Sequence, residues 1–230
     1  GAAKPDTGAP PPRCAASLCR AKGQSSVGAG LGAFLPESES GRSYDAPVPR
    51  GVCPPEPTVE VLESLTASDL NDLCDATDAA VQGGGGFGWV ETPSREVLER
   101  YWQGVLAMPA RILMVARLDG VICGTCQLWK PPLNNEAQAH VVTLTTNFVA
   151  PWARSYGLAK MLVEKAEDIA RKEGFAVINL EVRESMTRAI EIYESLGYVR
   201  FGMHPYSVRV KDETLKGYFY YKVIDPEAVK

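Results

Sequence analysis

The segment Phe148–Lys172, FVAPWARSYGLAKMLVEKAEDIARK, predicts an apolar strand into Pro151, a short loop over residues 152–157 and a long helix from about Leu158. Within the helical part, apolar residues recur at spacings of three and four, and charged residues fill the other face. Gly174 is placed to end this helix. The stretch therefore predicts a strand–loop–helix junction.

The loop favours a phosphate ligand. Gly157 lets the backbone turn tightly and approach a ligand, and the small Ala159 keeps bulk off the first helical turn. The first amides of a helix have no intrahelical partner and carry partial positive charge, to which Arg154 adds. A phosphate or pyrophosphate site is predicted here, although neither a GxxxxGK[ST] loop nor a GxGxxG pattern is present.

This loop resembles the acetyl-CoA loop of the GNAT superfamily of N-acetyltransferases, whose short signature is Q/R-x-x-G-x-G/A. The matching run is Val149-x-Pro151-x-x-Arg154-x-x-Gly157-Leu158-Ala159.

A second run is similar to another signature of the same family, in which the tyrosine is the general acid. It reads Ala189-x-x-x-Tyr193-x-x-x-Gly197-Tyr198. The two runs stand in the family's order and at about its separation. The resemblance is strong over His140–Ile224 and thin over Thr58–Trp129.

The resemblance implies that acetyl-CoA is a co-substrate, held where two neighbouring strands splay apart. The residues it implies at the cofactor are Phe148, Val149, Arg154, Ser155, Tyr156, Gly157, Leu158, Ala159 and Met186. Backbone amides near Phe148 and Val149 would hold the thioester carbonyl oxygen. Ser155 and Met186 depart from the family pattern, the latter standing where an asparagine often contacts the cofactor.

The resemblance also implies a catalytic pair. Tyr193 would donate a proton to the leaving thiolate, although its place on an apolar helix stripe also suits a core aromatic. A strand carboxylate, which serves some family members as base, is missing. Glu181 and His140 are the nearest titratable candidates for that task, and each could equally be structural.

The expected fold class is α/β (α+β), a GNAT-like mixed, mostly antiparallel sheet flanked by helices on both faces. Strands are expected at Thr58–Leu65, Arg111–Leu118, Val121–Trp129, His140–Val149, Ala176–Val182, Tyr198–Val210 and Tyr218–Ile224. Helices are expected from Ser68 or Asp69 to about Val81, over Pro93–Met108, over the segment from Leu158, and after a Ser185 cap. The dipeptide Asp119-Gly120 predicts a hairpin turn.

Residues 1–55 differ in kind from the expected domain at 56–230. Gly, Ala, Pro and Ser fill more than half of these positions, and large aliphatic residues are scarce. Such a stretch cannot bury enough apolar area to offset its ordering entropy, so we expect a flexible arm or sequence upstream of the domain.

Between the first two helices, Gln82–Glu91 combines a GGGG run with Phe87 and Trp89. In the resembled family this segment shapes the acceptor pocket, which gives the two aromatic residues a substrate-binding interpretation beside simple anchoring. Four aspartates at spacings of three, from Asp69 to Asp78, are interpreted as a solvated helix face.

Cys123 and Cys126 form the one CxxC among six cysteines. Residues three apart on a strand point to opposite faces, so we interpret both as small hydrophobic residues and not as a redox or metal pair. No disulfide framework is implied, and a reducing cytoplasm fits.

The sequence excludes some partners. A net charge of -4 gives no general attraction to nucleic acid or anionic lipid, and no apolar run has membrane-spanning length. The favoured function is acetyl transfer from acetyl-CoA to a primary amine of a small molecule or peptide. The alternative is a catalytically degenerate acyl-CoA-binding regulatory module. The acceptor's identity and the oligomeric state, a homodimer included, are left open.

Overall fold

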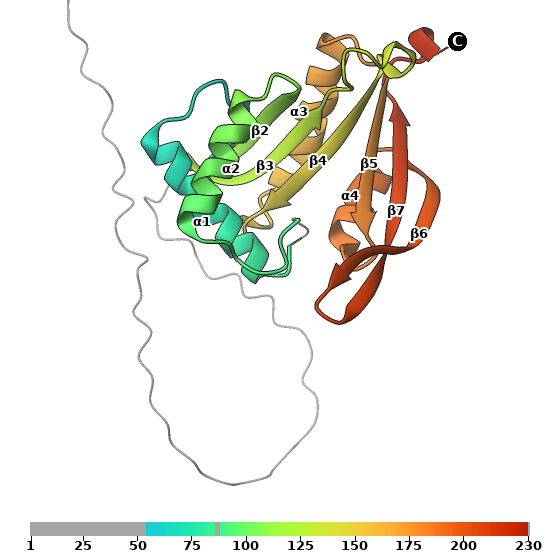
Figure 1. Ribbon diagram of the computed structural model, residues 1–230. Coiled ribbons are helices and arrows are strands. Elements are labelled where there is room, and N and C mark those ends of the chain that lie inside the picture. Colours follow the sequence, from blue (N-terminus) through green and yellow to red (C-terminus); the bar gives the residue numbers. More distant parts are fainter. Residues whose placement is uncertain (1–53, 86–87, 230) are drawn as a thin grey trace, which may run out of the picture. The chain divides into compact units, whose positions relative to one another are not determined.

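The computed structural model describes residues 54–85 and 88–229 (Figure 1). All but the end of the expected arm at residues 1–55 lies outside this range, as does Phe87. Within the described part of the chain, no helix is long and apolar enough to cross a membrane.

Seven strands form one sheet in the order β1-β2-β3-β4-β5-β7-β6, in which only β4 and β5 run parallel to each other. The strands are β1 (Pro57–Val61), β2 (Arg111–Leu118), β3 (Val121–Trp129), β4 (Val141–Val149), β5 (Val177–Arg183), β6 (Val199–Val210) and β7 (Glu213–Val223). This mixed, mostly antiparallel sheet confirms the expected fold class and element order.

Four α-helices cover the sheet from both sides (Figure 1). They are α1 (Ala67–Gln82), α2 (Arg95–Ala107), α3 (Leu158–Lys172) and α4 (Thr187–Ser195), with 3-10 turns at η1 (Glu136–Gln138), η2 (Pro151–Ala153) and η3 (Pro226–Val229). The apolar stripes of α1 and α2 pack on one face of the sheet around Leu73 and Trp102. Those of α3 and α4 pack on the other face around Leu162 and Tyr193.

The start of α1 corrects two expectations. Its cap is Thr66, and not Ser68 or Asp69: the Thr66 hydroxyl accepts from the Asp69 amide at 3.1 Å, and the Asp69 carboxylate accepts from the Thr66 amide at 3.2 Å. The aspartate series is not a plain solvated face either. Asp69 is buried and pairs with Arg117 at 2.8 Å, and Asp72 accepts from the Ile122 amide at 3.2 Å.

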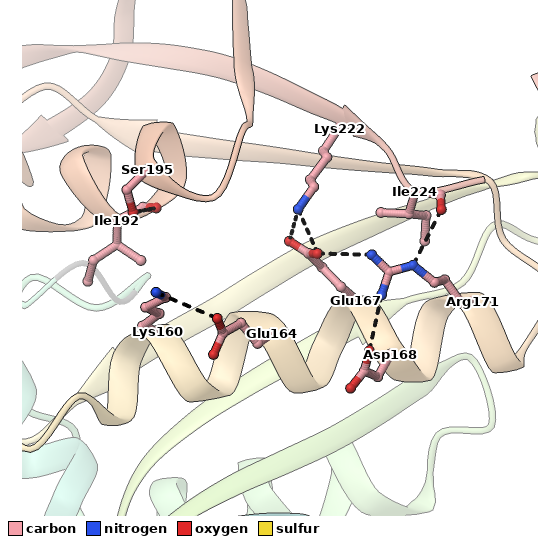
Figure 2. A network of polar contacts seen from close by, with 9 residues as sticks. All are labelled: Lys160, Glu164, Glu167, Asp168, Arg171, Ile192, Ser195, Lys222 and Ile224. Carbon is pink, nitrogen blue, oxygen red and sulfur yellow. Dashed lines mark hydrogen bonds and ion pairs between the residues drawn. The ribbon is translucent and has the colours of Figure 1, made fainter. Parts of the chain in front are cut away.

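A buried carboxylate ties α3 to β7 (Figure 2). Both carboxylate oxygens of Glu167 accept from the Lys222 ammonium, at 2.7 and 2.6 Å. One of them also accepts from the Arg171 guanidinium at 3.2 Å. Arg171 also reaches Asp168 and the backbone oxygen of Ile224. Because Glu167 is only 5% exposed, these partners offset the cost of burying its carboxylate.

Cys123 and Cys126 were expected to point to opposite faces of the sheet, and this expectation was wrong. Their interpretation as small hydrophobic residues was sound. A β-bulge opposite Ala116 and Arg117 adds one residue to β3, so Cys123 and Cys126 belong to the same apolar cluster beneath α3. Both are free and buried, and burial raises the pKa of each thiol, to about 11 for Cys123.

Candidate active site

The site forms where β4 and β5 separate (Figure 1). The two strands pair from Val141 opposite Val177 as far as Leu144 opposite Leu180, and no pairs follow although both strands continue. This is the splay that the sequence led us to expect. Beyond Leu144, the edge of β4 that faces β5 has backbone groups outside the ladder, which are available to a ligand.

A cavity of about 650 Å³ occupies this separation. Its walls come from the end of β4, the loop and first turn of α3, the start of α4, and the glycine segment after α1. The lining residues are Gly83–Gly85, Asn147–Val149, Ala153–Ser155, Gly157–Lys160, Ser185–Ala189 and Ile192. A volume of this size suits a cofactor or drug-sized ligand.

The loop before α3 is built as an anion cradle. Gly157 has φ 75° and ψ −1° and stands at the helix N-cap, where no side chain caps the first amides within the described residues. A Cβ added to Gly157 would meet no atom within 4 Å, because the space over it is open. The amides and their partial positive charge therefore face the cavity bare.

Positive side chains surround this cradle. Arg154, Lys160 and Arg188 line the cavity, and no carboxylate does so among the described residues. Lys160 lies 3.7 Å from Glu164 and Arg188 lies 2.8 Å from Glu191, both of which sit one turn further along their own helices. Bare amides and three cations fit a pyrophosphate and a further phosphate, the groups that coenzyme A carries.

Tyr193 is packed in the core beside the cavity. The residue is 4% exposed, its ring meets that of Tyr198 edge to face at 5.6 Å, and its hydroxyl accepts a bond of 3.0 Å from the Asn147 carboxamide. Tyr193 itself is not among the lining residues, whereas Asn147 is. Burial raises the pKa of Tyr193, so the phenol keeps its proton at neutral pH.

The two candidate bases are not brought to the cavity. His140 precedes the first residue of β4, eight residues before Phe148, which on an extended strand is roughly 25 Å away. His140 is therefore not among the residues that line the cavity, and its role as base stays a prediction. Glu181 lies on β5 next to buried Leu180 and Val182, which face α3, so its own side chain turns to the other face. There it accepts from the Ser207 hydroxyl.

Of the other predicted site residues, most line the cavity and some do not. Phe148, Val149, Arg154, Ser155, Gly157, Leu158, Ala159 and Met186 all line the cavity. Tyr156 is exposed and does not. Trp89 packs edge to face on Tyr101 at 4.9 Å, which favours the anchoring interpretation, and Phe87 lies outside the described residues.

Ser185 does not cap α4, whose N-cap position is Met186 without a side-chain cap bond. The start of α4 thus presents its amides to the same cavity as α3 does.

Asn147, Lys160, Arg188 and the glycines at 83–85 were not predicted as site residues. The glycine run was visible, but a binding interpretation was given only to Phe87 and Trp89 of the same segment. Lys160 directly follows the first signature and Arg188 directly precedes the second, so their proximity could have been inferred from helix geometry. Asn147 could not, because its contact with Tyr193 spans 46 residues.

The sequence matches the model of the acetyltransferase (GNAT) family over residues 76–198. An uncharacterized N-acetyltransferase in the hisH–hisA intergenic region of Azospirillum brasilense is 62% identical over 131 residues, which cover 57% of this chain and 78% of that protein. The uncharacterized N-acetyltransferase YhfO of Bacillus subtilis is 28% identical over 87 residues, or 38% of this chain and 58% of that protein.

Solved structures show the same fold. The yncA protein of Salmonella typhimurium, solved with its cofactor acetyl-CoA, has a TM-score of 0.61 at 16% identity and covers 74% of this chain and 95% of its own. The ribosomal-protein-S18-alanine N-acetyltransferase of Escherichia coli has a TM-score of 0.55 at 23% identity, with coverage of 74% and 95%. With a family match over more than half of the sequence and a splayed sheet around an anion cradle, the chain belongs to the GNAT family and is an acyltransferase whose co-substrate is acetyl-CoA.

Proposed function

We propose that this chain transfers the acetyl group of acetyl-CoA to a primary amine by direct attack, with Tyr193 as general acid. The observation that carries the proposal is the Tyr193 hydroxyl, protonated and held against a lining residue of the cavity. The cradle from Arg154 to Ala159 binds the pyrophosphate of acetyl-CoA, and amides of Phe148 and Val149 polarise the thioester carbonyl.

The cavity sets the protonation state of the acceptor. An aliphatic ammonium titrates near ~10 and is not nucleophilic until it loses a proton. No carboxylate or histidine lines the described part of the cavity, and three cations do. Because the described lining supplies no base, the amine enters as its free base, having released its proton to water.

The acceptor class remains broad within primary amines. The E. coli structural neighbour is described as acting on a ribosomal-protein alanine, which makes a peptide N-terminus one candidate and a small diffusible amine the other. The glycine segment at residues 83–85 forms a wall of the cavity with backbone alone, so an acceptor on this side would meet peptide groups and no side chains of these residues.

The decisive experiment is a thiol-release screen at mildly alkaline pH with acetyl-CoA against amino acids, polyamines, aminoglycosides and alanine-terminated peptides. Acceptor-dependent thiol release, with the acetylated amine identified by mass, is the expected result. Tight acetyl-CoA binding without turnover on any amine would instead favour a regulatory acyl-CoA-binding module.

A further inference from the structure

Asn147 occupies an unusual place between the cavity and the buried acid. Its Nδ2 donates to the Tyr193 hydroxyl oxygen at 3.0 Å, and the residue lines the cavity. Its other amide atom, Oδ1, is buried and has no hydrogen-bond partner among the described residues. Leaving a buried acceptor unsatisfied costs about 1–3 kcal/mol, so packing alone gives no reason for an asparagine at this position.

A local distortion of β4 aims this side chain. Thr125 pairs with Phe148 and Gln127 with Thr145, so β4 carries one extra residue at Thr146–Asn147. Thr146 takes φ 53°, which is strained for a β-branched residue, and its carbonyl is held by the Thr125 hydroxyl at 3.0 Å.

The bulge changes which face Asn147 occupies. Leu144 packs in the cluster beneath α3 and α4, and Phe148, four residues later, packs in the cluster beneath α1 and α2. Without the extra residue the two would share a face, and Asn147 would point away from α4. The strained bulge therefore turns Asn147 toward Tyr193. Such bulges are concentrated beside active sites, where they redirect a side chain.

We propose that Asn147 is a positioning residue for Tyr193, whose amide N–H holds the phenol oxygen and leaves the phenol proton to be donated. The inference rests on the proposed role of Tyr193 as acid. As the C–N bond forms, the C–S bond breaks with its electron pair on sulfur, and the phenol proton moves to that sulfur. The acetylated nitrogen releases its surplus proton to water, which balances the proton that the phenolate later takes up. The Asn147 N–H then stabilises the phenolate until it regains a proton from water.

The pKa of the Tyr193 phenol supports this role. Burial raises the pKa of Tyr193, which makes it a weaker acid, and the bond from Asn147 acts in the opposite direction. A general acid is most effective when its pKa is not far above the working pH. Asn147 therefore offsets part of the acid strength that Tyr193 loses by being buried.

The test is a double-mutant cycle on kcat. Asn147→Leu removes the donor, Asn147→Asp puts an acceptor in its place, and Thr143→Val on the exposed part of β4 is the control. We expect both Asn147 variants to lose at least tenfold in kcat with KM for acetyl-CoA within about twofold, and Thr143→Val to match the wild type. In a Tyr193→Phe background, Asn147→Leu should cause no further loss.

Two results would overturn the proposal. Equal losses from Asn147→Leu in both backgrounds would mean that Asn147 acts through packing, and full kcat in Asn147→Asp would mean that no donor is needed. A readout without turnover separates this proposal from the function itself. The ¹³Cζ NMR signal of Tyr193, assigned by its loss in Tyr193→Phe, should move in Asn147→Leu and not in Thr143→Val. An unmoved signal refutes the contact even if no acceptor is ever found.

Discussion

Gly157 and Gly174 bracket α3 with the same backbone geometry but different surroundings. Both have positive φ, 75° and 85°, and a Cβ at either would meet no atom within 4 Å. Only Gly157 lines the cavity. The pair therefore separates the conformational strain of a substitution, which they share, from obstruction of the anion cradle, which only one of them can cause.

Gly157→Val should greatly weaken acetyl-CoA binding, because its branched side chain would cover the first amides of α3. Each valine variant should lose about 1–3 kcal/mol of stability from its left-handed backbone. Calorimetric titration with acetyl-CoA should show near-wild-type affinity for Gly174→Val. Unchanged affinity in Gly157→Val would refute the assignment of this loop to the pyrophosphate.

Tyr193→Phe should lower kcat at least tenfold, or about 1.4 kcal/mol, because it removes the proton donor and keeps the packed ring. Acetyl-CoA affinity should be unchanged. Tyr220→Phe is the matched control: it removes another core hydroxyl, bonded to Glu194 at 2.8 Å, from outside the cavity lining. If steady-state kinetics show the same kcat for both variants and the wild type, Tyr193 is only a core aromatic.

Local motifs reveal the residues that act through the backbone and miss those that act across the sheet. Arg154, Gly157 and Ala159 were predictable because a loop-to-helix junction shows its chemistry in consecutive residues. Asn147 was not, since its direction depends on a bulge whose cause, the Thr125–Thr146 contact, joins separate strands. His140 was chosen because it lies close in sequence to the loop before α3. On an extended strand, however, residues a few positions apart in sequence lie far apart in space.

At the scale of elements, α1 is held at its start by a charge as well as by a cap. Asp69 closes the capping box with Thr66 and pairs with Arg117, which also binds Glu60 of β1 at 2.7 Å. Burial raises the pKa of Asp69, but its bonds from Thr66 and Arg117 outweigh that effect and lower it below the ordinary value of 3.8. The helix start, β1 and β2 thus meet at the Arg117 guanidinium.

Asp69→Asn should lower the free energy of unfolding at pH 7 by about 1–2 kcal/mol. A depressed folded-state pKa gives stability that is present above the unfolded value of 3.8 and disappears as pH falls through the folded value. Chemical denaturation between pH 2 and pH 7 should therefore show a smaller acid loss in Asp69→Asn. Asp78→Asn, whose partner is Gln82, is the control, and parallel curves for all three proteins would contradict the linkage.

For the Glu167–Lys222 ion pair, we predict that one substitution lowers the stability and that a second substitution restores it. Lys222→Met takes the ammonium partner from a carboxylate that is 5% exposed, so we expect a destabilisation of about 3 kcal/mol. Adding Glu167→Leu removes that charge and should restore most of the stability, because buried ion pairs are often replaceable by apolar residues. A double variant that is no more stable than Lys222→Met in thermal denaturation would show that the pair is a net stabiliser.

Periodicity predicted most elements, and long-range contacts account for the differences. The strands at Arg111–Leu118 and Val121–Trp129 and the helix at Leu158 have the bounds expected, since their alternation or stripe is uninterrupted. The cap of α1 moved to Thr66 because its partner Asp69 completes a box that the apolar pattern alone does not show. Expecting Cys123 and Cys126 on opposite faces failed because an alternation rule counts residues and cannot detect a bulge.

At the scale of the whole molecule, two apolar layers share one sheet and meet at the splay. The layer under α1 and α2 contributes Phe148 to the cavity, and the glycine segment after α1 lines the same side. The anion cradle lines the side of α3 and α4, where Tyr193 packs beside the cavity. The cradle belongs to the segment with the stronger family resemblance, and the glycine wall belongs to the segment with the weaker one.

The described domain begins close to β1, which makes its upstream boundary testable. The Glu56 amide donates to the Asp119 carboxylate in the β2–β3 turn at 3.0 Å, and its carbonyl accepts from the Asp119 amide at 3.3 Å. From Pro57 the chain pairs with β2. Val59 and Val61 pack against the core beneath α3, and Glu60 binds Arg117. Residues 1–55 are poor in the large apolar side chains that such packing needs. We therefore propose that the folded unit needs β1 and does not need residues 1–55.

Deleting residues 1–55 should shift the melting temperature by less than about 3 °C and leave acetyl-CoA affinity unchanged. Deleting residues 1–61 is the matched comparison, because it differs only by Glu56 and β1. It removes two packed valines and the Arg117 ion pair and exposes a new sheet edge, so we expect a loss of about 3 kcal/mol or more and a fall of roughly 6–12 °C. If the shorter deletion destabilises the protein as much as the longer one, residues 1–55 belong to the folded domain.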